Sequence, residues 1–115
     1  MALEAAGQFK TISLDDSAVT IKSNGGMMAV LSGQGKGTIR IPLRQIESIE
    51  WRDASRLGAG YIRICVSGMA PLKGNLMAGV HVLRAAQNDA NSVLFKLNKA
   101  QEFERIRNAI ERAIP

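Results

Sequence analysis

The chain has 115 residues, which is the size of one domain and enough to bury a core. Its 46% hydrophobic and 22% charged residues are typical of an ordered globular protein and argue against disorder. Fifteen basic against ten acidic residues give a net charge of +5, which favours acidic partners, although solubility alone is the simpler explanation.

The first residues, 1–7, are expected to be a flexible lead to a single domain spanning residues 1–115. They have neither the basic start nor the apolar stretch of a secretory signal. The apolar run at residues 74–83 is far too short to cross a bilayer. Cys65 is the only cysteine, so no intramolecular disulfide can form, and we expect a reducing cytoplasm.

From Phe9 to Leu97, short apolar alternation is broken by turn residues, which predicts β-strands. Pro42 lacks an N–H for a sheet ladder and therefore predicts an edge or a break between two strands. The strand at 61–66 should place Ile62, Ile64 and Val66 inward, with Arg63 facing outward. The strand-like stretches in chain order are residues 9–14, 18–23, 27–31, 38–52, 61–66, 76–85 and 92–97.

The period changes after residue 97. Apolar residues then recur at spacings of three and four, which predicts a helix over residues 99–114. Asn98 is placed to cap it, with Gln101 completing a capping box. Since one amphipathic helix is not stable alone in water, its apolar stripe must cover an open part of the sheet. That stripe consists of Phe103, Ile106, Ile110 and Ile114.

Short strands closed by one C-terminal helix are the order of a pleckstrin-homology-like (PH-like) domain. Over about residues 8–114 the chain resembles an actinobacterial PH-like domain family of unknown function. The resemblance is carried by Ile41-Pro42-Leu43 with Ile46, by Gly60–Arg63, and by Asn91–Phe95 leading to Phe103-Glu104. It implies an α+β barrel or sandwich of six to seven mainly antiparallel strands capped by one C-terminal helix. It implies no ligand and no catalytic residue.

The glycine-rich stretch at residues 31–38 does not match a phosphate-binding loop. A Walker motif would need glycine where Val30 stands and serine or threonine where Gly37 stands. A strand-like segment follows, so no helix N-terminus is offered to a phosphate. We therefore expect a hairpin tip that carries Lys36.

Basic residues form the first candidate contact surface for an anion or a partner. Glu47, Glu50 and Asp53 dilute the charge of that stretch, so a solvated sheet face is the simpler interpretation. Specific phosphoinositide binding is not expected, because Asp15 and Asp16 would repel a phosphorylated headgroup. The candidate residues are Lys36, Arg40, Arg44 and Arg63.

Methionines beside glycine-rich turns form the second candidate, an apolar interface. Methionine adapts to irregular contacts, which suits either a gap in the core or a partner surface. The candidate residues are Met27, Met28, Met69, Leu72, Leu76 and Met77.

Catalytic chemistry is not expected. His81 is the only histidine and has no Cys, Asp or Glu at metal-ligand spacing, so neither a metal nor a cofactor is indicated. Our leading hypothesis is a non-catalytic bacterial interaction module that binds protein, including a second copy of itself as a homo-oligomer. The alternative is an anionic-surface binder that contacts nucleic acid or an acidic membrane through the basic sheet face.

Overall fold

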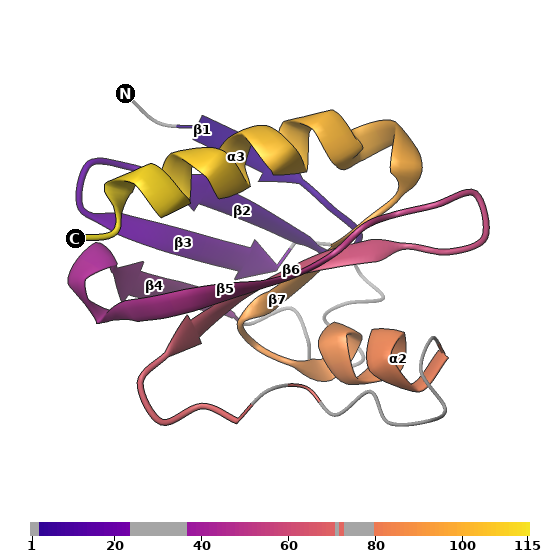
Figure 1. Ribbon diagram of the computed structural model, residues 1–115, viewed down its shortest axis with the longest axis horizontal. Coiled ribbons are helices and arrows are strands. Elements are labelled where there is room, and N and C mark those ends of the chain that lie inside the picture. The colour runs from indigo at the N-terminus through magenta and orange to yellow at the C-terminus, as the bar shows by residue number, and fades with distance from the viewer. Residues whose placement is uncertain (1–2, 24–36, 71, 73–79) are drawn as a thin grey trace.

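The computed structural model describes residues 3–23, 37–70, 72 and 80–115, and these form two packed antiparallel sheets with helices on two sides (Figure 1). The first sheet has the order β1-β2-β3-β4 and the second the order β5-β6-β7. Seven strands in two sheets with a C-terminal helix confirm the expected α+β class. The strands are β1 Leu3–Ala6, β2 Lys10–Leu14, β3 Ala18–Ser23, β4 Thr38–Pro42, β5 Ile46–Arg52, β6 Gly60–Val66 and β7 Ser92–Phe95.

The alternation in the first hairpin folds as the sequence predicts. Ile12 and Leu14 of β2 and Val19 and Ile21 of β3 are buried, and Ile12 pairs directly with Ile21. Strand β4 ends at Pro42, where the short helix η1 (Leu43–Gln45) leads the chain into the second sheet. The predicted strand at 27–31 lies outside the described residues.

The expectation of a flexible N-terminal lead is wrong for residues 3–6, because these residues form β1 and pair antiparallel with β2. Gly7 allows the following turn to lie close to the second sheet. A Cβ there would collide with the Leu94 carbonyl, the Val93 side chain and the Phe103 ring. The turn therefore joins the first sheet to β7 and to the C-terminal helix.

The C-terminal helix α3 (Ala100–Ala113) forms where its apolar period predicts, and it packs over β1, β2 and β6. Its start differs from the prediction. Asn98 lies within the short helix η2 (Leu97–Lys99), and the residue at the cap position, Lys99, makes no side-chain capping bond. The helix is held instead by its buried stripe, Phe103, Ile106 and Ile110.

The predicted strand at 76–85 is wrong where the structure describes it, since residues 80–88 form the helix α2 (Val80–Asn88). Leu83 and Ala86, three residues apart, place their side chains on the outer face of the second sheet. There they meet Tyr61 and Leu94 in a small second apolar cluster. The sheet is thus covered on both faces, which strand alternation by itself does not reveal.

Candidate functional site

The four predicted cations do not form one surface. Arg40 in β4 and Arg44 in η1 are exposed, but Arg63 in β6 is buried, with only 5% of its surface exposed. The prediction that Arg63 faces outward into solvent is therefore wrong. Its side chain does lie on the outer side of β6, but Ala70 and Asp89 contact it there. Lys36 lies outside the described residues.

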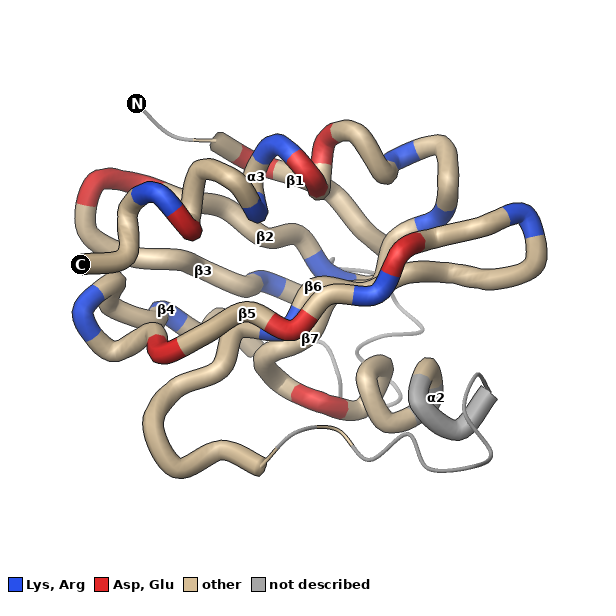
Figure 2. Tube along the Cα trace, viewed as in Figure 1, with Lys and Arg blue, Asp and Glu red and all other residues tan. Residues whose placement is uncertain are grey.

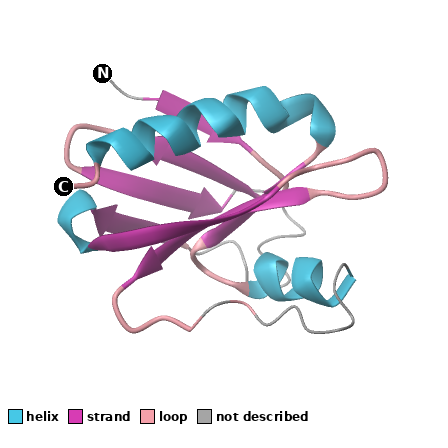
Figure 3. Cartoon of the chain, in the orientation of Figure 1, coloured by secondary structure: helices cyan, strands magenta, loops and turns pink. Residues whose placement is uncertain are grey.

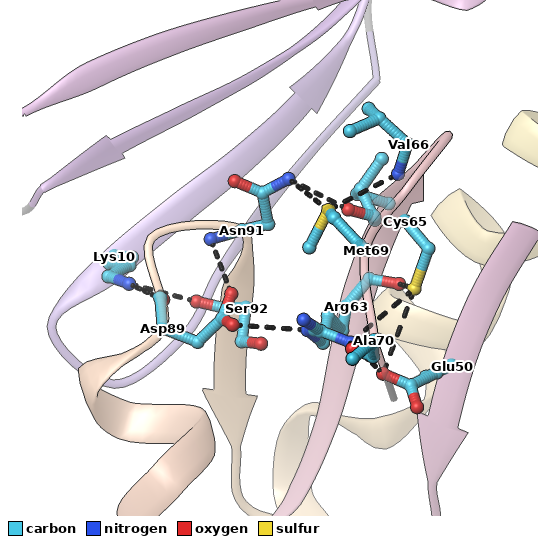
Figure 4. A network of polar contacts seen from close by, with 11 residues as sticks. Lys10, Glu50, Arg63, Cys65, Val66, Met69, Ala70, Asp89, Asn91 and Ser92 are labelled. Carbon is cyan, nitrogen blue, oxygen red and sulfur yellow. Dashed lines mark hydrogen bonds and ion pairs between the residues drawn. The ribbon is translucent and has the colours of Figure 1, made fainter. Parts of the chain in front are cut away.

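Arg63 is the centre of a polar network between the second sheet and the segment that covers it (Figure 4). Its Nη1 donates to Glu50 Oε2 at 2.5 Å and to the Ala70 carbonyl at 2.9 Å. Its Nε donates to Asp89 Oδ2 at 3.1 Å. One buried cation therefore has two carboxylates and a carbonyl as partners, so it offers no free charge to a ligand.

The pKa values in this network follow from burial and charge. Burial alone would lower the pKa of Arg63, but its hydrogen bond to Glu50 and the charges of Asp89 and Glu50 outweigh burial and raise it. The pKa of the Cys65 thiol is raised, first by burial and then by the charge of Glu50. Cys65 is thus a buried side chain whose raised pKa disfavours the reactive thiolate.

Two further side chains, those of Lys10 and Asn91, join residues 89–92 to the neighbouring strands. Lys10 of β2 donates from Nζ to the Asp89 carbonyl at 2.6 Å and to the Ser92 carbonyl at 3.1 Å. Burial lowers the pKa of Lys10, and the charge of Asp89 partly opposes that. Asn91 donates from Nδ2 to the Ile64 carbonyl at 2.9 Å. We read the network as structural, because its groups satisfy one another across two sheets and the end of α2.

Arg40 is also engaged. Its Nη1 lies 2.9 Å from Asp15 Oδ2, and its Nη2 donates to Ser17 Oγ at 2.7 Å. Asp15 in turn accepts hydrogen bonds from the backbone N–H groups of Ser17 and Ala18. These contacts hold the pKa of Asp15 far below its usual range. The hydrogen bond from the Ser17 N–H has the largest effect, followed by those from Arg40 and from the Ala18 N–H. This pair stabilises the β2–β3 turn.

Asp15 predicts a specific acid sensitivity. Because its pKa is lower in the folded than in the unfolded state, its stabilising contribution is complete above about pH 5 and declines as the pH falls further. Urea unfolding at a series of acidic pH values should show a shallower decline for Asp15→Asn than for the wild type. Glu104→Gln is the control, since Glu104 accepts no hydrogen bond among the described residues, and it should keep the wild-type slope. Equal slopes for wild type and Asp15→Asn would contradict the assignment.

The six residues of the predicted apolar interface likewise do not form one surface among the described residues. Met69 is half-buried, and its sulfur accepts from the Val66 N–H at 3.3 Å and from Asn91 Nδ2 at 3.5 Å. Leu72 packs against the second apolar cluster. Both side chains thus serve the fold. The other four, Met27, Met28, Leu76 and Met77, lie outside the described residues.

The described part of the chain holds no group of three or more His, Cys, Asp or Glu side chains that could bind a metal. His81 lies in α2 and not in the predicted strand. No helix among these residues is long and apolar enough to cross a membrane. Basic and acidic residues are interspersed along the trace in Figure 2.

A groove between β5 and α3 was not anticipated from the sequence. Its volume is about 440 Å³, and half-buried Trp51 forms part of its wall. The Arg107 guanidinium stacks on the Trp51 ring at 4.4 Å, and Arg107 Nε lies 3.4 Å from Glu111 Oε1. The alternation of Ile49 and Trp51 was visible in the sequence, but their juxtaposition with α3 was not. The lining residues are Glu47, Ser48, Ile49, Trp51, Arg107, Glu111 and Ile114.

Among the described residues, no strand pairs with the edge of β5 that faces away from β6, beside this groove. The N–H and the carbonyl of Ile64 in β6 are both hydrogen-bonded to Asn91, on the β7 side. Because backbone groups alternate in direction along a strand, those of the neighbouring residues Arg63 and Cys65 point toward β5. Glu50 pairs with Arg63, and Ile49 pairs with Ile64. The backbone groups of Glu50 therefore face β6, and those of Ile49 face the open edge. By the same alternation, those of Trp51 face the open edge too.

The fold defines a small α+β sandwich domain with a structural ion-pair network and an open strand edge. Residues 12–111 match the family described as Domain of unknown function (DUF4429), and the chain belongs to that family. No curated protein and no solved structure matches the chain.

Proposed function

We propose that this protein is a non-catalytic PH-like interaction module that binds protein along the open edge of β5, with a second copy of the chain as partner. The observation that carries the proposal is the edge itself. β5 has seven residues, against five, four and four for the other sheet-edge strands, β4, β1 and β7. Two of its residues, Ile49 and Trp51, direct backbone donors and acceptors outward beside the groove.

A second copy fits this edge for a general reason. Two identical strands related by a two-fold axis run antiparallel, so each N–H of one strand can meet a carbonyl of the other. The groove between β5 and α3 then offers room for side chains of the added strand. Apolar Ile49 and Trp51 at the edge would be further removed from water, which favours association.

Sedimentation or light scattering over a concentration series tests the proposal. Wild type should change from monomer to dimer as the concentration rises. Ile49→Pro should remain monomeric, because proline removes the outward N–H yet is tolerated on a free strand edge. Ile49→Ala is the matched control, since it also shortens the side chain but keeps the N–H, and it should still dimerise. A strict monomer at high concentration, or equal behaviour of the two variants, would overturn the proposal.

The alternative, an anionic-surface binder that uses the basic sheet face, has weaker support. Arg63 forms ion pairs with Glu50 and Asp89, and Arg40 forms one with Asp15. Among the described candidate cations, this leaves Arg44 as the one available to an anionic partner. We further propose a reducing bacterial cytoplasm as the setting. The buried thiol of Cys65 and the resemblance to an actinobacterial PH-like family support this, and no cofactor is proposed.

A further inference from the structure

Large apolar side chains project into solvent at one end of the molecule. Among the described residues, the large hydrophobic residues that are exposed are Phe9 at 56%, Leu57 at 99% and Leu97 at 48%. They lie in three different connections: the β1–β2 turn, the β5–β6 hairpin and the segment between β7 and α3. A single exposed leucine is ordinary, but large apolar side chains that gather at one end of a domain indicate a contact surface.

These three connections lie next to one another. Gln8, in the β1–β2 turn, bridges to Leu94 of β7. A hollow of about 420 Å³ is bordered by Gln8, by residues 55–59 of the hairpin and by residues 96–98 after β7. In Figure 3 the β5–β6 loop projects beyond the sheets at this end. Segments far apart in the sequence thus form one continuous end of the sandwich.

Cations accompany the apolar residues. Arg56 adjoins Leu57, Lys96 adjoins Leu97, and both cations are exposed with no carboxylate partner among the described residues. The nearest acidic residue in the hairpin, Asp53, accepts a hydrogen bond from Trp51 Nε1 at 2.7 Å, near the base of the hairpin. We call this region the end surface; it consists of Phe9, Arg56, Leu57, Lys96 and Leu97.

We propose that the end surface docks on an anionic lipid bilayer, with Leu57 entering the interfacial region and Arg56 and Lys96 contacting lipid phosphates. Projecting apolar side chains beside unpaired cations match a surface that has an apolar interior and a negative boundary. Phe9 is the single aromatic residue of the end surface, and the two leucines offer no stacking surface to nucleic acid bases, so the larger part of the apolar surface favours lipid over a nucleic acid. The cations are spread over two loops and form no enclosed phosphate pocket, so net lipid charge and not one headgroup governs binding.

This docking is separate from the proposed pairing of β5. The hairpin follows the end of β5 at Arg52, whereas the strand pairing depends on the middle of the strand at Ile49. A bilayer could therefore hold two copies that are joined along β5. Vesicle binding by Ile49→Pro should keep its lipid preference and its dependence on Leu57.

Co-sedimentation with vesicles of phosphatidylcholine, alone or mixed with phosphatidylglycerol, tests the inference. Wild type should bind the mixed vesicles and not the neutral ones. Leu57→Gln should weaken binding about tenfold, because it removes the inserted side chain from a site where it supports no folding contact. Arg56→Gln should weaken binding about fivefold, the effect of one cation near an anionic surface. The matched control is Arg44→Gln, which makes the same change in net charge at the opposite end of β5 and should bind as wild type.

Three results would overturn the inference. The first is no binding to the mixed vesicles. The second is equal weakening by Arg44→Gln and Arg56→Gln, which would indicate general charge attraction. The third is vesicle binding that Leu57→Gln leaves unchanged. Binding of a single-stranded oligonucleotide or of polyglutamate without vesicle binding would assign the end surface to another partner and would equally refute lipid docking.

Discussion

Phe103→Ala is expected to lower the free energy of unfolding by about 3–5 kcal/mol, the cost of emptying a large buried aromatic site. Phe103 is fully buried, and its ring stacks on Phe95 with centroids 4.4 Å apart. The same ring lies against the Gly7 turn, so it joins α3 to both sheets. Denaturant unfolding followed by circular dichroism measures the loss.

Since domains of this size are stable by only about 5–15 kcal/mol, Phe103→Ala could unfold outright. Phe103→Leu keeps most of the volume and should lose about 1–2 kcal/mol, which keeps the measurement within range. Glu104→Ala changes the adjacent exposed residue of α3 and should shift stability by less than about 0.5 kcal/mol. A loss from Phe103→Ala no larger than that from Glu104→Ala would show that α3 is not anchored through this ring.

Arg63→Ala is expected to lower the free energy of unfolding by about 2–4 kcal/mol. Removal of the guanidinium takes away the cation that the carboxylates of Glu50 and Asp89 both contact, and it leaves the Ala70 carbonyl without its donor. Both carboxylates keep some access to water, which places the expected loss below that of a fully enclosed pair. Denaturant unfolding at neutral pH measures it.

The triple variant Glu50→Gln/Arg63→Met/Asp89→Asn separates charge from packing. It removes all three charges and keeps similar volumes, so it should be more stable than Arg63→Ala alone. Arg40→Ala, which breaks an exposed pair with Asp15, should change stability little. If the triple variant were less stable than Arg63→Ala, the loss would come from packing, and the electrostatic account of the network would be wrong.

Which residues form the candidate surfaces depends on how the elements pack together, and the sequence of one strand does not contain that information. Arg63 alternates with Ile62 and Ile64, so the pattern correctly places it on the outer side of β6. Whether that side meets water depends on α2 and on residues such as Ala70 and Asp89, whose position over β6 is decided by the tertiary structure. Leu57 and Leu97 are unremarkable in the sequence, and they form a surface with Phe9 because three distant connections reach the same end.

Local periodicity alone determined several elements of this protein. The two-residue period of β2 and β3 and the three- and four-residue spacing of α3 predicted their buried faces, because each pattern is written into one contiguous segment. Pro42 marked the end of β4 through its missing N–H. Strands β2 to β7 and the C-terminal helix therefore followed from the sequence, whereas β1 and α2 did not.

Tertiary structure alone decided what those elements contact. Residues 3–6 form β1 because β2 supplies their partners, and residues 80–88 form a helix because the outer face of β6 and β7 takes up the side chains of Leu83 and Ala86. The open edge of β5 and the end surface likewise depend on which strands and loops lie beside them. Burial, pairing and exposure are properties of two surfaces together, so no single segment of the sequence specifies them.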